Sequence, residues 1–410
     1  MTPSRACRVV LAIGITLIVV VIIVGVVARG RYQAEFPKRV AIPPGKVQPQ
    51  LISGWRGVLM LAPDGSLWTW GEQPADFGTG TATPRKIGGD SDWRQIGLNA
   101  VIAAALKSDG SLWCWGWDYG SAGQRGVATN FFKTPTRIGA ETNWVRVAVG
   151  GTHCVAVKQD GSLWAWGGNR FGQVGDGTTA SRPSPVPISS EKWKNAFAAP
   201  LNSYALRADG TIWGWGHGFA FRSRSTNYLS PVMLDAASNW VSLAAHDWPP
   251  VALKADGTLW SWSVDEDQRQ AGMAQIGVAN DWREIYAGGH NFAARKRDGS
   301  WWAAGNNGMG QLGLGNTDHI NMAEPKELPF EFEPWAFSIG GSTTALLAGD
   351  GAVWTWGQQL GAPYRPPTAR FLKHLLNRTG LSHFDTNDTP RFNLVPKKLW
   401  TVGSTNALAK

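Results

Sequence analysis

The sequence predicts an all-β fold, a seven-bladed β-propeller built from four-stranded blades, and three observations support that prediction. A phrase of the form DGSLWAWG recurs seven times, and it begins at Asp64, Asp109, Asp160, Asp209, Asp256, Asp298 and Asp350. A tryptophan stands 15 or 16 residues before six of these aspartates. The aspartates are 42 to 52 residues apart, and self-similarity at this period, in short strands, is typical of propellers.

Each repeat unit has the pattern of a hairpin followed by a loop. The alternating run CVAVK (154–158) predicts a strand, and Asp160-Gly161 predicts a tight turn because glycine readily adopts a positive φ. The return strand carries Trp164 and Trp166, which are two residues apart and therefore share one face. Thirteen of the 14 positions of this tryptophan pair are filled, with Ala304 as the exception. Such large rings need a second sheet to bury them, so we expect them between blades.

We assign residues 50–410 to the propeller, with an insertion at 358–398 in the last unit. Within the insertion, PTARFLKHLLNRTG (367–380) spaces its apolar and basic residues as a short helix, which suits packing on the propeller or docking on a membrane or partner. The apolar segment 399–410 contains a further tryptophan, Trp400. We expect this segment to close the ring by pairing with the first blade, near residues 55–70, because paired terminal strands leave no open edge.

Three segments precede the propeller: a short basic tail (1–8), a transmembrane helix (9–28) and a Pro-rich stalk (29–49). Residues 9–28 are 20 residues without a charge, which is long enough to cross a bilayer as a helix. We therefore expect a single-pass signal anchor at the membrane, with cleavage after Ala28 as the alternative. The propeller is expected outside the cytoplasm, although counting Lys and Arg on both sides of the helix favours the opposite orientation.

The net charge of +9 arises at the two ends of the chain. Residues 1–46 hold seven Lys and Arg and one acid, whereas residues 47–364 hold 24 Lys and Arg against 27 Asp and Glu. The mildly acidic body offers no broad basic surface to neutralise phosphates, so no nucleic-acid partner is expected. We expect a monomer that meets the membrane through its N-terminal helix.

The sequence contains no recognisable catalytic or cofactor motif. None of the seven histidines forms a zinc-type pair, and a set in the insertion (His374, His383, Asp385 and Asp388) is as well explained by a solvated loop. The recurring Asp lacks the flanking carboxylates of a calcium loop. We therefore predict no enzyme and no cofactor, catalytic or metal site, and we interpret the repeated Asp and Trp residues, Trp164 and Trp166 included, as structural.

Two further features of the strands are expected to be structural. A basic residue stands two positions before the Asp in five units, where a solvated charge on a strand edge is expected: Lys107, Lys158, Arg207, Lys254 and Lys296. Cys114 and Cys154 lie in apolar strands of neighbouring units. We expect buried thiols there, with a disulfide as the alternative in an oxidising compartment.

Residues 144–178, WVRVAVGGTHCVAVKQDGSLWAWGGNRFGQVGDGT, closely resemble the repeat of the regulator of chromosome condensation family. The resemblance covers about 350 residues and implies a seven-bladed β-propeller. Its Gly-Gln-x-Gly element survives at 123–126, 172–175 and 310–313, and Gly-Gly-x-His is intact only at 150–153, where His153 is expected to pack. The founding activity of the family is nucleotide exchange on a small nuclear GTPase. Secreted bacterial propellers of similar repeat type inhibit β-lactamases by gripping them with loops.

Residues that depart from the repeat pattern are the candidates for partner binding. The loops after the Trp-Trp strand should share one end of the propeller, and aromatic and Arg residues on loops are good interface anchors. The candidates are Trp117, Phe219, Phe221, Arg222, Arg224 and Trp248, for which packing back onto the rim is the alternative. We predict a membrane-anchored protein–protein interaction module that binds an unknown protein through this loop face. The alternatives are an exchange-factor-like regulator of a small GTPase on the cytoplasmic side and a carbohydrate-binding module.

Overall fold

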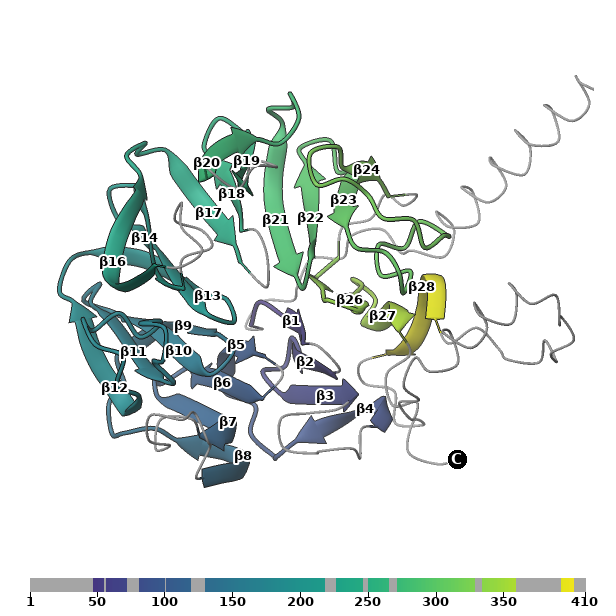
Figure 1. Cartoon of the computed structure of the whole chain (residues 1–410). Coiled ribbons are helices and arrows are strands. Elements are labelled where there is room, and N and C mark those ends of the chain that lie inside the picture. Colours follow the sequence, from purple (N-terminus) through teal and green to yellow (C-terminus); the bar gives the residue numbers. More distant parts are fainter. Residues whose placement is uncertain are drawn as a thin grey trace, which may run out of the picture.

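A computed structural model describes residues 47–54, 57–71, 81–99, 101–118, 130–217, 226–245, 250–264, 271–328, 334–358 and 392–401. These residues form 28 strands in seven four-stranded sheets. The sheets stand around a common centre as the blades of a propeller (Figure 1). The predicted fold class is therefore confirmed. The basic tail, the predicted transmembrane helix and residues 29–46 of the stalk lie outside the described residues, among which no helix has the length and apolar character needed to cross a bilayer.

Each blade takes four consecutive strands of the chain, so the ring follows the sequence without a crossover. Blades 1 and 2 contain β1 (Gln50–Ser53), β2 (Gly57–Leu61), β3 (Leu67–Gly71) and β4 (Thr81–Ile87), then β5 (Trp93–Leu98), β6 (Ile102–Lys107), β7 (Leu112–Asp118) and β8 (Asn130–Arg137). Blades 3 and 4 contain β9 (Trp144–Val149), β10 (His153–Lys158), β11 (Leu163–Gly167) and β12 (Arg182–Ser189), then β13 (Trp193–Ala198), β14 (Asn202–Arg207), β15 (Ile212–His217) and β16 (Asn227–Asp235).

The remaining three blades continue the same order. Blade 5 contains β17 (Trp240–Ala244), β18 (Val251–Lys254), β19 (Leu259–Val264) and β20 (Ala271–Gln275). Blade 6 contains β21 (Trp282–Gly288), β22 (Asn291–Lys296), β23 (Trp301–Gly305) and β24 (Lys326–Glu327). Blade 7 contains β25 (Ala336–Ile339), β26 (Thr343–Leu347), β27 (Ala352–Gln358) and β28 (Phe392–Thr401). All pairs are antiparallel, as a meander of consecutive strands requires.

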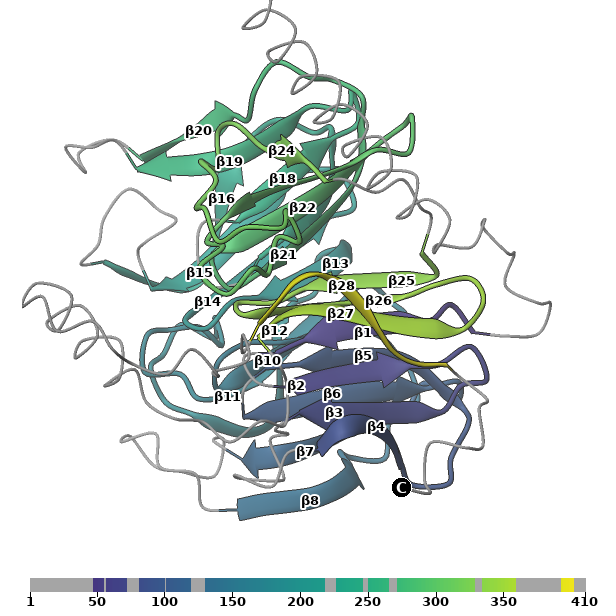
Figure 2. The same cartoon turned by 90° about the vertical axis from the view of Figure 1, so that its right-hand side faces the viewer.

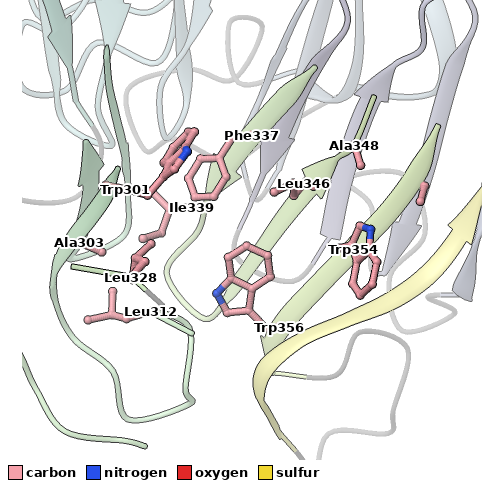
Figure 3. Close-up of a cluster of buried hydrophobic side chains, with 12 residues drawn as sticks. Trp301, Ala303, Leu312, Leu328, Phe337, Ile339, Leu346, Ala348, Trp354 and Trp356 are labelled. Carbon is pink, nitrogen blue, oxygen red and sulfur yellow. The ribbon is translucent and has the colours of Figure 1, made fainter. Parts of the chain in front are cut away.

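The core consists of seven hydrophobic clusters, one between each pair of neighbouring blades. In the cluster between blades 6 and 7, Trp301 lies beside Phe337, with 4.6 Å between ring centroids, and Trp356 fills the space next to them (Figure 3). The second tryptophan of each pair is buried against the preceding blade, as Trp166 is against blade 2. The expectation that the paired rings fill the spaces between blades is confirmed.

Blade 6 fills its missing tryptophan position in another way. Ala304 pairs directly with Phe292 on β22, and both side chains are fully buried. In blade 3 the same pair of positions holds Trp166 and the small Cys154, so the large residue has moved to the opposite strand. The exchange keeps the volume between blades 5 and 6 filled, which close packing of the interior requires.

The ring closes by packing and not by exchange of a terminal strand. The prediction that residues 399–410 pair with the first blade is wrong for the part that is described, because Trp400 on β28 pairs with Val353 on β27. Strand β28 lies beside β27 in both views of the ring (Figures 1 and 2). Blade 1 already has four strands from residues 50–87, whereas the fourth strand of the blade 7 sheet is β28, which begins at Phe392. Residues 392–398 of the predicted insertion accordingly belong to β28.

Blade 1 and blade 7 are held together by a core cluster and by hydrogen bonds. The cluster includes Leu51 and Trp70 of blade 1 with Leu347 of blade 7. The Ser53 backbone N–H donates to Ser338 Oγ at 2.8 Å, which satisfies a buried group on the edge of β1 that pairs with no described strand. The closure therefore has the same physical basis as the six other blade interfaces.

Candidate functional site

The strand order gives the propeller two ends with different connections. The Asp-Gly turns, between the second and third strands of each blade, lie at one end together with the links between blades; we call this end the turn face. The connections from first to second strand and from third to fourth strand lie at the other end, the loop face. The third strand of every blade ends at the loop face, and the two loops after the Trp-Trp strand that are fully described, in blades 3 and 6, lie there as expected.

The Asp side chains on the turn face are already occupied by the turns themselves. Asp160 Oδ1 accepts hydrogen bonds from the Ser162 N–H at 2.8 Å and from its Oγ–H at 2.6 Å, and Ser162 Oγ in turn accepts from Trp164 Nε1 at 2.9 Å. These hydrogen bonds from Ser162 lower the pKa of Asp160. The same relay recurs with Ser or Thr in five other blades, so the phrase DG(S/T)xW is a self-satisfying turn.

The glycine of the turn is required by conformation and by space. Gly110 has a φ of 79°, which L side chains rarely adopt, and a Cβ there would lie 2.1 Å from the carbonyl oxygen of Thr142. Thr142 belongs to the link that enters the next blade, so this turn also packs against that link. Four other turns do the same, at Gly65, Gly161, Gly210 and Gly257. The repeated phrase has a complete structural explanation at the turn face.

The basic residues that precede the turns are not solvated edge charges, and that prediction is wrong. Lys158 is only 5% exposed, and its Nζ lies 3.5 Å from the ring centroid of Trp164 and 4.7 Å from that of Trp144. Glu141 Oε1 accepts from the same Nζ at 2.7 Å. The cause is register: a bulge in the β9–β10 ladder brings Lys158 opposite Trp144. Lys107, Lys254 and Lys296 lie over the equivalent pair of rings in their own blades.

The loop face carries a well-packed loop after the Trp-Trp strand of blade 3. Asn169 is buried at its centre, where its Oδ1 accepts from the Val174 N–H at 2.9 Å and its Nδ2 donates to Asp176 Oδ1 at 3.1 Å. Asp176 also pairs with Arg182 at 2.5 Å, and hydrogen bonds from Thr178 and Arg182 lower the pKa of Asp176 despite its partial burial. The equivalent loop of blade 6 uses Asn307 in the same way.

This loop also covers the interface between blades 3 and 4. The Gln173 carbonyl oxygen accepts from Trp215 Nε1 at 2.9 Å and from Ser203 Oγ at 2.7 Å. His153 Nε2 lies 2.7 Å from Ser203 Oγ, and its ring is fully buried. Burial lowers the pKa of His153 to about 3, so the ring is neutral at physiological pH. The structure thus gives His153 a packing and hydrogen-bonding role between two blades.

A group of partly exposed side chains lies on the loop face above that interface; we call it the blade 3–4 patch. The ring of Phe171 lies 5.0 Å from that of His217, and the Arg170 guanidinium lies 5.5 Å from the Phe171 centroid. The carbonyl oxygen of Leu201 accepts from the His217 N–H at 3.1 Å, and the Leu201 side chain is 38% exposed. The patch therefore combines an aromatic and a cationic group with an exposed aliphatic residue that is joined to His217 through the backbone.

Five of the six predicted partner-binding residues lie outside the described residues: Phe219, Phe221, Arg222, Arg224 and Trp248. Trp117 lies on β7 near the loop-face end of that strand, and its side chain is not described. The segment with the two phenylalanines follows directly after His217 of the blade 3–4 patch. The segment with Trp248 joins β17 to β18, whose connected ends are at the loop face.

Sequence reasoning missed Arg170, Phe171 and Leu201. Arg170 and Phe171 stand inside the family-like stretch that begins at Trp144, so they looked like part of the repeat pattern. Leu201 stands in a short link between β13 and β14, and only the fold shows its exposure and its contact with His217. Among the described residues, no three His, Cys, Asp or Glu side chains are close enough to hold a metal ion.

Comparison with known proteins agrees with this architecture. The regulator of chromosome condensation (RCC1) repeat matches residues 109–157 and 160–199, and a second form of the same repeat matches residues 144–173. No curated protein matches the chain in sequence. The chain is an RCC1-like seven-bladed propeller, with the repeat recognised in blades 2 to 4.

Solved structures show the same fold at low sequence identity. Prp20p of Saccharomyces cerevisiae, described with its binding properties to Gsp1p and histones, is 18% identical, with a TM-score of 0.62 and coverage of 87% of this chain and 88% of that one. Yeast RCC1 (Prp20) with Kap60 bound is 16% identical, with a TM-score of 0.63 and coverage of 88% and 86%. Human WBSCR16 is 15% identical, with a TM-score of 0.61 and coverage of 78% and 85%.

Proposed function

We propose that this protein is a non-enzymatic, membrane-tethered propeller that binds another protein through its loop face. The blade 3–4 patch is the observation that carries the proposal. Leu201, Phe171 and Arg170 combine the exposed apolar, aromatic and cationic groups that anchor protein interfaces. The Asp side chains of the turn face, by contrast, are engaged in their own turns.

The sequence around the blade 3–4 patch also indicates that the loop face is the binding face. The segment 218–225, which follows His217, contains Phe219, Phe221, Arg222 and Arg224 and no acidic residue. Connections between strands tolerate variation that strands do not, so binding residues concentrate on them. Propellers of the same fold bind proteins: the yeast structures are described with Kap60, Gsp1p and histones.

A binding measurement with matched variants tests this role. The full chain is used to capture partners from membrane and soluble fractions, alongside Leu201→Glu and Val278→Glu variants. Val278 is 97% exposed on the link between blades 5 and 6, at the turn face, so it controls for the introduced charge. Capture of a specific protein should fall about tenfold or more for Leu201→Glu and stay unchanged for Val278→Glu. Equal capture by both variants contradicts a role for the patch.

The orientation across the membrane separates the proposal from its alternative. The charge-free segment 9–28 is the basis for the tether, and a short basic tail before such a segment usually directs export. A reporter fused after Lys410 should then be active outside the cytoplasm. Cytoplasmic activity of the reporter would favour the alternative, a regulator of a small GTPase, which the structural similarity to yeast RCC1 supports. Release of a fluorescent guanine nucleotide from a small GTPase would then be the assay.

A further inference from the structure

Two cysteines meet across the interface between blades 2 and 3. Cys114 lies on β7 of blade 2 and Cys154 on β10 of blade 3, and both belong to the hydrophobic cluster that joins the blades. Both side chains face this interface, because Cys154 shares a sheet face with Trp166 of the same cluster and Cys114 lies on the face of β7 opposite to Trp115. Cys114 is 8% exposed and Cys154 is 1% exposed, so the pair is sealed from solvent. These are both of the cysteines in the described part of the chain.

The repeat itself does not require thiols at these two positions. The residue equivalent to Cys114 is Ala165 in blade 3 and Ala303 in blade 6, and the residue equivalent to Cys154 is Ala103 in blade 2 and Ser203 in blade 4. Small side chains therefore satisfy the packing at other interfaces of the same ring. Packing alone therefore does not account for two thiols that face the same interface.

We propose that Cys114 and Cys154 form a disulfide that joins blades 2 and 3 when the chain folds in an oxidising compartment. This inference rests on the proposed location outside the cytoplasm, where disulfides persist. The oxidant is the disulfide of a thiol–disulfide oxidoreductase or of a small-molecule thiol. One cysteine thiolate attacks that disulfide and releases one thiolate; the second cysteine thiolate attacks the mixed disulfide and releases the other. The new S–S bond forms, two electrons reduce the oxidant, and the two cysteine protons pass to the released thiolates.

The closed interface determines when this reaction takes place. A hydrogen bond with the Cys114 thiol, together with burial, raises the pKa of Cys154. Because the thiolate is the reactive form, thiols in the folded ring exchange slowly. The cysteines are exposed to the oxidant only before blades 2 and 3 pack together. The redox state of the pair is therefore set during folding and then preserved by the core.

Oxidative refolding tests the pairing independently of location. The full chain with Cys7→Ser is unfolded, reduced and refolded in glutathione disulfide, then alkylated under denaturing conditions and analysed by peptide mass. The expected product is a linked peptide pair containing Cys114 and Cys154, lighter than the two free peptides by two hydrogen atoms. Alkylated or glutathione-bearing cysteines in the refolded protein overturn the proposal. Cys114→Ala, for which Ala165 is the precedent in the ring, should refold and leave Cys154 unable to form the linked pair.

Analysis of the protein from its native membrane tests the redox state in the cell. Where the reporter after Lys410 places the propeller outside the cytoplasm, the pair should resist alkylation under denaturing conditions until a reductant is added. Free thiols in exported protein overturn the disulfide inference and leave the proposed location outside the cytoplasm unaffected. Activity of the reporter in the cytoplasm instead overturns that location, and the oxidative refolding experiment then decides whether Cys114 and Cys154 can form a disulfide.

Discussion

The ammonium group of Lys158 lies 3.5 Å from the ring centroid of Trp164, between that ring and Trp144 on the neighbouring strand. The contact connects three strands of blade 3 at the turn face. Four of the seven blades place a Lys in this way, and blade 4 places Arg207 5.8 Å from Trp213. The basic residue two positions before the turn Asp, which the sequence suggested to be a solvated charge, therefore packs against the tryptophan rings of its own blade.

Replacing Lys158 by Met should lower the free energy of unfolding by about 1–2 kcal/mol, because the stem is kept while a desolvated cation–π contact is lost. The midpoint of urea unfolding measures the change. Lys194→Met is the matched control, since Lys194 is exposed, and its effect should stay within about 0.5 kcal/mol. Equal losses in the two variants would show that the rings do not use the cation.

The exchanged pair in blade 6 predicts coupling between Phe292 and Ala304. Phe292→Ala should cost about 3–5 kcal/mol because it opens a cavity, and Ala304→Trp alone should cost about 1–3 kcal/mol because it overpacks the site. The double variant restores the arrangement of blade 3, so its loss should be smaller than the sum by about 1 kcal/mol or more. A double-mutant cycle measured by urea unfolding tests this, and strictly additive losses would contradict it.

Burial of neutral His153 predicts a pH dependence of stability. Its pKa falls from 6.5 to about 3 on folding, so its contribution is full above about pH 6.5 and is lost as the pH falls toward 3, where the unfolded chain binds the extra proton. The free energy of unfolding should fall across this window by up to about 1.4 kcal/mol per pH unit. His153→Gln should remove that slope. An identical pH profile for the variant would contradict the buried neutral ring.

The turn aspartates affect the free energy of unfolding at a lower pH than His153 does. Hydrogen bonds from the following Ser or Thr lower the pKa values of Asp109, Asp160, Asp209, Asp256 and Asp298, so the contribution of these carboxylates is lost only as the pH falls below about 3.8. The difference between wild type and His153→Gln from pH 6.5 to about 4 therefore belongs to the histidine.

The relay from Asp160 through Ser162 to Trp164 predicts a requirement for a hydroxyl. Ser162→Ala should lower stability by about 1 kcal/mol, because Trp164 Nε1 loses its acceptor and Asp160 loses one donor. Ser162→Thr should be close to neutral, since Thr211 and Thr258 make the same contacts in blades 4 and 5. Thermal unfolding of the two variants gives the comparison, and similar losses for both would rule out the hydroxyl as the cause.

Much of the fold could be predicted because it follows local rules. The Asp-Gly turn, the spacing of Trp164 and Trp166 and the period of the repeat each depend on a few consecutive residues. The contact of Lys158 with Trp144 depends on a bulge between two strands, which the sequence does not reveal. The sequence did not indicate that the strand with Trp400 pairs with blade 7 and not with blade 1, because a long segment separates β28 from β27.

The candidate site was less predictable from the sequence. Phe171 and His217 are far apart in the chain. They meet because Phe171 follows β11 of blade 3 and His217 ends β15 of blade 4, and both strands end at the loop face. Leu201 has no distinguishing sequence context, and its exposure is a property of the assembled ring. The off-pattern residues Phe219 and Phe221 indicated the neighbouring segment but could not indicate this contact.

Site-specific photo-crosslinking in cells tests the binding role of the loop face most directly. A photoreactive residue is placed at Leu201 on the loop face or at Val278 on the turn face, both in the full chain, with exposures of 38% and 97%. A discrete adduct with one protein is expected from position 201 and none from position 278, although the latter is more exposed. An adduct from position 278 with none from position 201 would contradict it.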